Sequence, residues 1–470
     1  MTAPLAFDVI VLGAGPAGAT CAATAAESGR RVAVIDEQPR AGGQVWRAPM
    51  GGFPGKGDAD QASGDALRQR LAASPATGLL GHRVWSVVRT ASGYRVDTLG
   101  PDGPTALEAP SLVVATGAHE RVVPFPGWTT PGVIGLAAAT VLLKSHGVVP
   151  GRRLVVAGCG PLLAVVAAGL VKAGAEVAAI VDIAPRSAWL SRLPAILGQP
   201  HLAARGLSWA FAVAKAGVPT LSGQGVRRVE GDEAVSRVVI GPVDADGAPV
   251  EGPERVIEAD SVIVGHGLTT ASEVTRLLRA EHRFDRLRGG WIPVVDGAFQ
   301  TSLPGLHAIG DGAGIRGQAM ASLAGEALGW HLAGRTAEAA ATRARMAAAT
   351  PFSDAMAGLM AQRPAQVRSI APETVVCRCE DVTRAEIDAA VDAGATQIDQ
   401  LKHFTRCGMG PCQGRSCADT VQELMAARLG ASREAIGQWT GRPPLRPVPL
   451  GEVIGAFSYD DIPIPTPAPL

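Results

Sequence analysis

Residues 1–370 contain no Cys-x-x-Cys pair, and their two cysteines stand alone. A redox-active dithiol of that spacing is therefore absent from this part of the chain. The sequence also has no Gly-x-Ser-x-Gly, His-Glu-x-x-His or phosphate-loop motif. These absences argue against the hydrolases and nucleoside triphosphatases that carry such motifs. No complete substrate site is recognisable, and the catalytic residues stay unknown.

The chain has no excess of charge of either sign. Lysine plus arginine number 43, and aspartate plus glutamate also number 43. A balanced charge gives no indication of binding to nucleic acid or to an anionic surface. We therefore expect no nucleic-acid partner.

Long apolar runs and a basic leader are also missing. Residues 1–7 have neither the basic start nor the apolar stretch of a signal peptide. Apolar stretches such as 155–171 are interrupted by glycines, which fits βα units better than membrane spans. We expect a cytoplasmic protein with no transmembrane segment, whose contact with a membrane, if any, is peripheral and made through a complex. Disulfides are improbable in that compartment.

The N-terminal segment has the pattern of a βαβ unit in a chain long enough for two to four domains. An apolar strand leads into a glycine loop, a helix and a second strand that ends at Asp36. Such a loop brings a pyrophosphate to the helix N-terminus. Asp36, at the end of the second strand, is placed to bind a ribose hydroxyl, with Glu37 as the alternative. The predicted nucleotide loop comprises Gly13, Gly15, Pro16, Ala17 and Gly18.

A second unit of the same kind begins at Leu154. Its glycine loop is Gly158-Cys-Gly160, and its second strand ends at Asp182. Leu163 occupies the third glycine position, so the helix must stand further from the strand. This lobe is either empty, or holds a structural nucleotide, or binds NAD(P).

Two more apolar strands end in small-residue turns. One ends at Thr116-Gly117, and the other ends at Gly310-Asp311, followed by a helix over 318–329. Asp311 alone would be read as a helix cap. With the upstream nucleotide motifs it becomes a candidate cofactor-binding residue.

Five of the seven cysteines lie between Cys377 and Cys417. Cys377-x-Cys379 is followed, after a long interval, by Cys407, Cys412 and Cys417 with four residues between neighbours. Thiolates at this density bind iron–sulfur clusters or zinc. Zinc sites usually use Cys-x2–4-Cys spacing, so the tighter first pair favours an iron–sulfur cluster. Three cations flank the cysteines and would ease reduction of an anionic cluster: Arg378, Arg406 and Arg415.

Together these motifs resemble one group of flavoproteins. Residues 5–340 resemble the two-dinucleotide-binding flavoprotein superfamily, and the stretches 36–47 and 115–128 strengthen the resemblance. The cysteine motifs narrow it to the large FAD/[2Fe–2S] subunits of opine oxidase, D-hydroxyproline or proline dehydrogenase complexes and hydrogen cyanide synthase. The chain is also similar to the sarcosine oxidase alpha subunit.

The resemblance implies an α/β fold with two Rossmann-like dinucleotide-binding domains and a small helical [2Fe–2S] domain. A NAD(P)-type domain at 126–265 is inserted into an FAD domain formed by 1–125 and 266–345. A helical hinge or linker at 346–372, a bacterioferritin-associated-ferredoxin-like domain at 373–440 and a proline-rich tail at 441–470 follow. The tail would wrap a partner or be disordered.

The resemblance also implies cofactor ligands. FAD would contact the nucleotide loop residues together with Asp36, Glu37, Gly43, Gln44, Thr116, Gly117, Gly310 and Asp311, and Asp311 would bind its ribityl chain. The cluster ligands would be Cys377, Cys379, Cys412 and Cys417. The family carries the second pair closer together, so the four-residue gap leaves Cys407 as a rival ligand. The inserted domain would hold a second nucleotide, NAD(P) or ATP, or none.

The function implied is that of an electron-transferring subunit in a hetero-oligomeric dehydrogenase or oxidase. Such a complex oxidises a secondary amine or amino acid of the opine, hydroxyproline, proline, sarcosine or glycine class to an imine. An oxidase-like flavoprotein beta subunit would carry the substrate, and a small ferredoxin-like subunit would complete the assembly. His119 and His266 follow flavin-domain strands and would either tune a flavin or only bond to backbone. The alternatives are a stand-alone NAD(P)H:acceptor oxidoreductase and a nucleotide-retaining structural subunit.

Overall fold

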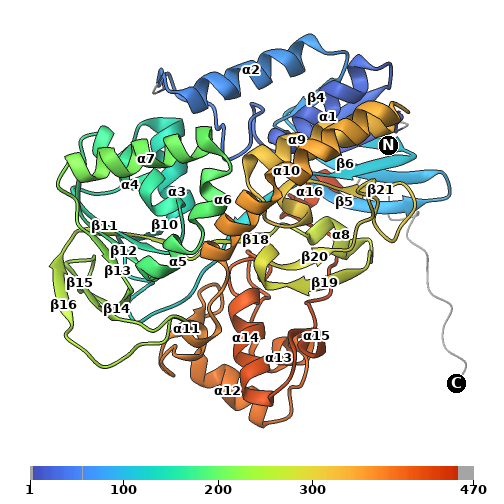
Figure 1. The fold of residues 1–470 in the computed structure, drawn as a ribbon. Helices are drawn as coiled ribbons and strands as arrows, with labels where there is room; N and C mark the ends of the chain where they lie inside the picture. Colours follow the sequence, from blue (N-terminus) through green and yellow to red (C-terminus); the bar gives the residue numbers. More distant parts are fainter. Residues whose placement is uncertain (1–3, 56, 454–470) are drawn as a thin grey trace, which may run out of the picture.

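Each βαβ repeat builds a parallel five-stranded sheet in the computed structural model, which describes residues 4–55 and 57–453 (Figure 1). In the first sheet, strand β8 (Ser111–Val114), which precedes the second repeat, pairs with strand β21 (Leu306–Ala308), which follows it. The second lobe is therefore an insertion in the first, and the predicted α/β class is confirmed. The strand order is β21 (Leu306–Ala308), β8 (Ser111–Val114), β2 (Val9–Leu12), β3 (Val32–Asp36) and β4 (Thr77–Leu80).

The second sheet carries the inserted lobe. Its order places β11 and its glycine loop in the centre, where both faces are covered. The strands are β10 (Val133–Gly135), β17 (Ser261–Gly265), β11 (Arg153–Gly158), β12 (Glu176–Asp182) and β13 (Thr220–Ser222). Its helices are α3 (Leu136–Val141), which continues as a π-helical turn (Leu142–His146), and α4 (Leu162–Lys172), α5 (Arg186–Leu190), α6 (Leu193–Leu197) and α7 (Pro200–Lys215).

Smaller sheets flank the two lobes. They are formed by β1 (Leu5–Ala6), β7 (Gly103–Ala109), β6 (Gly93–Gly100) and β5 (Arg83–Thr90); by β14 (Gln224–Glu230), β15 (Arg237–Pro242) and β16 (Arg255–Glu258); by β9 (Ala118–Glu120) and β18 (Leu268–Thr270); and by β19 (His282–Asp285) and β20 (Gly290–Pro293). The β9–β18 pair lies where the chain leaves the first lobe and returns to it.

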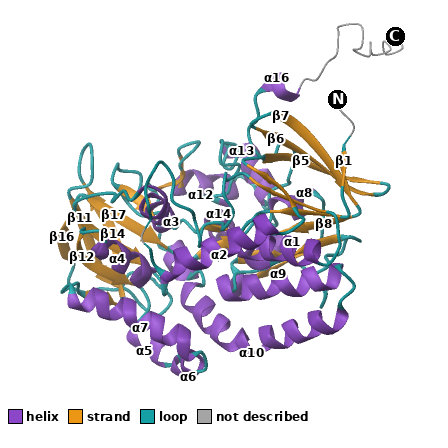
Figure 2. Ribbon diagram, turned by 90° about the horizontal axis from the view of Figure 1, so that it is seen from above, coloured by secondary structure: helices purple, strands orange, loops and turns teal. Residues whose placement is uncertain are grey.

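Small residues bring the helices of the first lobe close together. The central helix α9 (Gln318–Leu332) packs against α1 (Pro16–Glu27) and α10 (Thr336–Met360), as Figure 2 shows. A Cβ on Gly325 would overlap the carbonyl of Ala17, so this approach requires glycine. Helices α2 (Ala59–Ala73) and α8 (Glu273–Leu277) complete the lobe, with 3-10 turns at Arg286–Arg288 and Gly310–Ala313.

The interval 346–372, expected to be a helical hinge or linker, is largely helical. Helix α10 runs through residue 345 without a break as far as Met360, even though Pro351 lies inside it. Helix α11 (Pro364–Arg368) occupies much of the remainder. The first lobe and the interval 346–360 thus share one helix.

The C-terminal helices form a unit with its own core, drawn in orange and red at the bottom of Figure 1. Buried Ile387, Leu401, Val421 and Leu424 pack together there. A capping box between Thr383 and Glu386 fixes the start of α12. The elements are β22 (Val375–Cys377), β23 (Val382–Thr383), α12 (Arg384–Asp392), α13 (Ile398–Thr405), α14 (Ala418–Leu429) and α15 (Arg433–Ile436).

The start of the tail lies on this chain rather than free of it. Leu445 N donates to Trp85 O of β5 at 2.8 Å, and Arg446 Nε lies 3.7 Å from Glu37 Oε2. Residues 445 and 446 therefore contact this chain, and the contact of the tail with a partner stays a prediction. A short helix α16 (Leu450–Val453) follows, and residues 454–470 lie outside the described part.

In residues 4–55 and 57–453, no helix combines the length and apolar character needed to cross a membrane.

Candidate functional site

The glycine loop of the first lobe is shaped as a cradle at the start of α1. Gly13 has a φ of 101°, and a Cβ there would overlap the carbonyl of Ala115. A Cβ on Gly18 would overlap the carbonyl of Gly13, so helix and strand meet only through glycine. Gly15 is the N-cap of α1 and provides no side-chain cap. The first N–H groups of α1 are thus left for an anion.

A second loop closes on this cradle. Gly43 lies opposite Gly15: a Cβ on Gly43 would be 2.9 Å from Gly15 Cα. A Cβ on Gly15 itself would meet only Gly43 Cα, at 3.7 Å. There is accordingly room in front of Gly15 for atoms of a ligand. Gln44, next in the loop, is exposed and accepts a hydrogen bond from Arg47 Nη1 at 3.0 Å.

Asp36 ties the end of β3 to the same loop. Its Oδ2 accepts a hydrogen bond from Ala14 N at 2.6 Å, and its Oδ1 accepts one from Gln38 N at 2.8 Å. Burial raises the pKa of Asp36, against these hydrogen bonds. Glu37 is more exposed and faces Arg446.

The two small-residue turns predicted from the sequence also meet here. A Cβ on Gly310 would be 2.8 Å from Ala17 Cβ, so this turn rests on the start of α1. Burial raises the pKa of Asp311, whose Oδ1 accepts hydrogen bonds from Arg316 N and Gly317 N at 2.9 and 3.0 Å. Thr116 Oγ1 donates a hydrogen bond to Ala271 O at 2.7 Å. The structure thus brings the segments around 13–18, 36, 43, 116–117 and 310–311 together at one helix terminus.

The glycine loop of the second lobe is covered by this chain. A Cβ on Gly160 would be 2.5 Å from Cγ of Met360, the last residue of α10. Asp182, at the position of the ribose-binding acid, accepts hydrogen bonds from Ala184 N and Trp189 Nε1 at 2.9 and 3.1 Å. Leu163 is buried in the core of the lobe. Met360 therefore lies against the second glycine of this loop.

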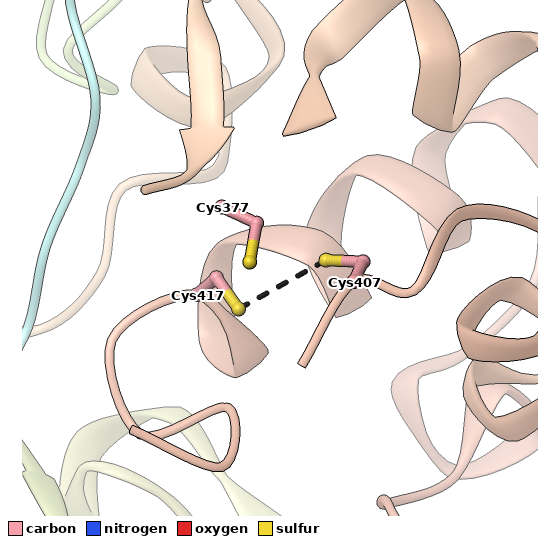
Figure 3. A group of neighbouring side chains, drawn as sticks. All are labelled: Cys377, Cys407 and Cys417. Carbon is pink, nitrogen blue, oxygen red and sulfur yellow. Dashed lines mark hydrogen bonds between the residues drawn. The ribbon is translucent and has the colours of Figure 1, made fainter. Parts of the chain in front are cut away.

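Three thiols converge in the C-terminal unit (Figure 3). The Sγ atoms of Cys377, Cys407 and Cys417 all lie within 4.8 Å of one another, and all three residues are buried. Cys407 Sγ and Cys417 Sγ are 3.9 Å apart. Hydrogen bonds from Cys407 and Cys417 hold the pKa of Cys377 far below its usual value. A thiolate at Cys377 is the form that binds iron.

The other two cysteines lie on the outer side of this group. Cys379 is exposed and Cys412 is half-buried. Burial raises the pKa of the Cys379 thiol, against a backbone hydrogen bond with Cys412 that lowers it. A cavity of about 520 Å³ is lined by Cys377, Cys379, Cys412 and Cys417, whereas Cys407 is not among its lining residues. The four predicted ligands therefore share one cavity, and the proximity of Cys407 to two of them keeps it as a rival.

The remaining walls of the cavity come from both lobes. They include the β9 region with His119 and Glu120, the start of α3, and His266 after β17. Burial raises the pKa of Glu120 to about 7, although N–H groups of Ala137 and Leu136 hydrogen-bond it. Burial lowers the pKa of His266 to about 3, so this imidazole is neutral at physiological pH. Glu120 was not among the predicted site residues, because the neighbouring sequence does not indicate that its side chain is buried.

The flanking arginines are held by carboxylates or by an aromatic ring. Arg415 Nε donates to Glu273 Oε1 at 2.6 Å, and the same oxygen is 2.6 Å from His119 Nε2. Arg406 Nε donates to Glu380 Oε2 at 2.9 Å. The guanidinium of Arg378 lies over the ring of Trp128, with Cζ 6.0 Å from its centroid. The loop that carries Cys412 and Cys417 is thereby attached to the first lobe through Glu273.

A family model described as pyridine nucleotide-disulphide oxidoreductase matches residues 7–337. The chain belongs to this family of oxidoreductases. A second model, the sarcosine oxidase A3 domain, matches residues 371–456. The fold of residues 7–337 is thus that of FAD-binding oxidoreductases, and the cysteine unit has a counterpart in sarcosine oxidase.

Full-length relatives narrow the place of the chain within the family. It is 34% identical to the A chain of opine oxidase from Rhizobium meliloti over 478 residues, covering 95% of this chain and 87% of that protein. It is 32% identical to hydrogen cyanide synthase subunit HcnB of Pseudomonas aeruginosa, covering 94% and 97%. The crystal structure of L-proline dehydrogenase from P. horikoshii has the same fold, with a TM-score of 0.69, 20% identity, and coverage of 96% and 80%. The resemblance inferred from the motifs is confirmed.

Proposed function

We propose that this chain is the FAD- and [2Fe–2S]-carrying, electron-transferring subunit of a hetero-oligomeric complex that oxidises an amine or amino acid. The observation that carries the proposal is the shared cavity, in which four cysteines face the exit of the first lobe at 119–123. Because the cysteine site lies next to the nucleotide-binding lobe, electrons could pass between FAD in that lobe and an iron–sulfur cluster on the cysteines.

The first lobe would hold FAD. The N–H groups at the start of α1 would bind its pyrophosphate, with Gly13, Gly15, Pro16, Ala17, Gly18 and Gly43 as the cradle. Asp36 or Glu37 would bind the ribose, and Asp311, Gly310, Thr116, Gly117 and Gln44 would line the rest. The room in front of Gly15 and the missing cap of α1 support this assignment. FAD supplies a hydride acceptor that can also release electrons singly.

The cysteine unit would hold the [2Fe–2S] cluster, which accepts one electron at a time. Cys377, Cys379, Cys412 and Cys417 are the proposed ligands, because all four line one cavity and thiolates are the donors that such clusters require. Arg378 and Arg415 line the same cavity and would stabilise added negative charge. Zinc is the less favoured occupant because of the Cys-x-Cys spacing.

The substrate class follows from the relatives. Their names are opine oxidase, hydrogen cyanide synthase and, for the C-terminal unit, sarcosine oxidase. We infer a secondary amine or amino acid that is oxidised to an imine on an oxidase-like flavoprotein partner, since the relatives are named as subunits. A small ferredoxin-like protein would be a further partner. We place the complex in the cytoplasm, because thiolate ligands require reduced cysteines.

The stand-alone NAD(P)H reductase is disfavoured. Met360 lies on the glycine loop of the second lobe, and the sequence of residues 1–370 has no Cys-x-x-Cys dithiol. A purely structural, nucleotide-retaining subunit would not need a converging set of thiols.

The proposal is tested by expressing the chain with and without an oxidase-like flavoprotein as the candidate partner. We expect co-purification and dehydrogenase activity with one of an opine, proline, hydroxyproline or sarcosine and an artificial acceptor. The isolated chain should show no such activity. Robust amine oxidation by the isolated chain would place the substrate pocket here and refute the division of labour.

A further inference from the structure

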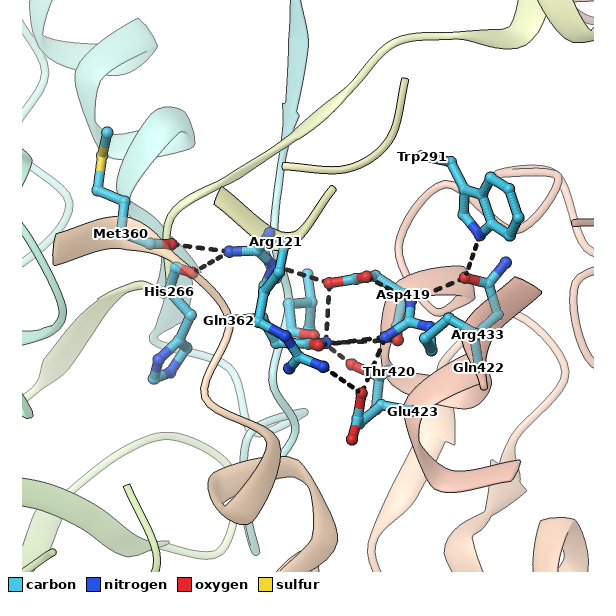
Figure 4. Close-up of polar contacts among 12 residues, drawn as sticks. Arg121, His266, Trp291, Met360, Gln362, Asp419, Thr420, Gln422, Glu423 and Arg433 are labelled. Carbon is cyan, nitrogen blue, oxygen red and sulfur yellow. Dashed lines mark hydrogen bonds and ion pairs between the residues drawn. The ribbon is translucent and has the colours of Figure 1, made fainter. Parts of the chain in front are cut away.

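The first turn of α14 follows Cys417 directly and is held by side chains from distant segments (Figure 4). Cys417 is the N-cap of this helix. Asp419 Oδ2 accepts hydrogen bonds from Arg121 Nε at 2.7 Å and from Gln362 Nε2 at 2.9 Å. Its Oδ1 accepts one from Arg433 Nη2 at 2.7 Å. One carboxylate therefore joins three segments of the chain next to a proposed cluster ligand.

A second bond fixes the same turn to the same strand exit. Thr420 Oγ1 donates to Val122 O at 2.7 Å. Arg121 and Val122 belong to the segment that leaves the first lobe, 298 residues away in sequence from their partners. The position of Cys417 is thus set relative to the nucleotide-binding lobe as well as within its own unit.

Arg121 is itself immobilised. Its Nη1 donates to His266 O at 3.1 Å and to Met360 O at 2.9 Å, and the residue is only 3% exposed. These carbonyls lie just after β17 and at the end of α10. The guanidinium therefore links both lobes and α10 to Asp419, which a flexible ammonium could not do.

The ion pairs of Asp419 with Arg121 and Arg433 are better suited to fixing the position of α14 than to stabilising the fold. Removing charges from water costs several kcal/mol per ion, so a buried ion pair often adds little net stability. Its geometry is nevertheless well defined, because each charge is left uncompensated if the partner moves. The Asp419 side chain is 14% exposed and lies between two buried arginines. It therefore holds the start of α14 in one position relative to Arg121 and Arg433.

We propose that Asp419 is a positioning residue that fixes Cys417, and with it the cluster, against the first lobe. The inference rests on the proposed function, since it concerns the cluster that Cys417 would bind. Asparagine at 419 can accept at its oxygen only, and its amide would face an arginine N–H. Either the link to Arg121 or the link to Arg433 would then be lost.

Glu423 offers a matched control on the same helix. It is 1% exposed and accepts hydrogen bonds from Arg433 Nη1 and Arg368 Nη2 at 3.1 and 2.9 Å. It lies one turn further from Cys417. Its partners are Arg433, Arg368 and Arg286, whose Nη2 lies 3.5 Å from Glu423 Oε2, and none of them belongs to the segment 119–123 that leaves the first lobe. Glu423→Gln thus removes a buried carboxylate of α14 but leaves the bonds of Asp419 to Arg121 and of Thr420 to Val122 in place.

The experiment compares full-length wild type, Asp419→Asn, Glu423→Gln and Arg121→Lys. Each is assayed for FAD, iron and sulfide, for the EPR spectrum of the reduced cluster, for its midpoint potential, and for thermal stability. We expect Asp419→Asn to keep FAD and iron but to change the g-values and raise the midpoint potential, because a negative charge beside the cluster is lost. Arg121→Lys should also change the g-values, because it loosens the same link, whereas Glu423→Gln should lower only the melting temperature.

Unchanged g-values and potential in both Asp419→Asn and Arg121→Lys would overturn the inference, whatever happens to the melting temperature. Equal shifts in Glu423→Gln would also overturn it, since they would show a general effect of buried charge. If Asp419→Asn does not fold, Arg121→Lys decides the question alone. A wild type without iron and sulfide would instead refute the proposed function, and this inference with it.

Discussion

Met360, the last residue of α10, lies on Gly160 in the glycine loop of the second lobe, where a Cβ would be 2.5 Å from its Cγ. The pyrophosphate of a dinucleotide would have to occupy that space. We predict that anaerobic mixing with NADH or NADPH leaves the flavin oxidised on the timescale of seconds, as followed by stopped-flow absorbance. Rapid stoichiometric bleaching by either nucleotide would favour the reductase alternative.

Gly15→Val should abolish FAD binding. A side chain at Gly15 has no protein atom nearer than 3.7 Å to its Cβ, so the fold tolerates it, but it fills the path of the pyrophosphate. The Kd for FAD should rise at least about tenfold, the equivalent of roughly 1.4 kcal/mol of binding free energy, and the flavin released on denaturation should fall accordingly. Gly206→Ala in α7, where a Cβ meets nothing within 4 Å, is the control and should keep full flavin. Full flavin in Gly15→Val would mean that the site is wrongly placed.

Glu120 should make stability depend on pH. Burial raises its pKa from 4.5 to about 7, so the folded state binds the proton more tightly than the unfolded state. The resulting stabilisation is complete below pH 4.5 and is lost as the pH rises through 7. Its full size is at most about 3 kcal/mol.

Melting curves from pH 5 to 8 test this directly. The loss of melting temperature across that range should be smaller in Glu120→Gln, which keeps an oxygen for the N–H of Ala137 but cannot ionise. Parallel pH profiles in the two proteins would show that Glu120 titrates normally.

Two truncations of the tail should differ in their effect on cofactor content. Removing residues 454–470 should leave flavin and iron content unchanged. Removing 442–470 should lower both, because this also removes the bonds of Leu445 to Trp85 and Arg415 and the contact of Arg446 with Glu37. Flavin and iron are measured on the purified proteins, and equal contents in both truncations would show that 442–447 does not support either site.

Local patterns predicted the elements of the first lobe closely. The expected strand ending at Asp36 and the start of the helix at Gln318 agree with β3 and α9. Apolar periodicity and glycine spacing encode these features within a short stretch of sequence. The insertion of one lobe in the other followed from the resemblance to the family.

Contacts between distant segments could not be predicted in this way. Nothing near Met360 indicates that it covers Gly160, and nothing near Asp419 indicates Arg121 as its partner. The gathering of Cys407 with Cys377 and Cys417 depends on how the loops after α13 and β22 pack. Such contacts depend on how the whole chain packs, and the spacing of motifs along the sequence does not determine that packing.

The cofactor content of the purified full-length chain decides whether it carries both FAD and a [2Fe–2S] cluster. We expect FAD, about two iron and about two acid-labile sulfide per chain, and a paramagnetic signal after reduction. Serine at Cys377, Cys379, Cys412 or Cys417 should abolish iron and sulfide, whereas Cys407→Ser should retain most of both. One zinc per chain with no sulfide and no reducible signal would show that the cysteine unit does not hold a [2Fe–2S] cluster.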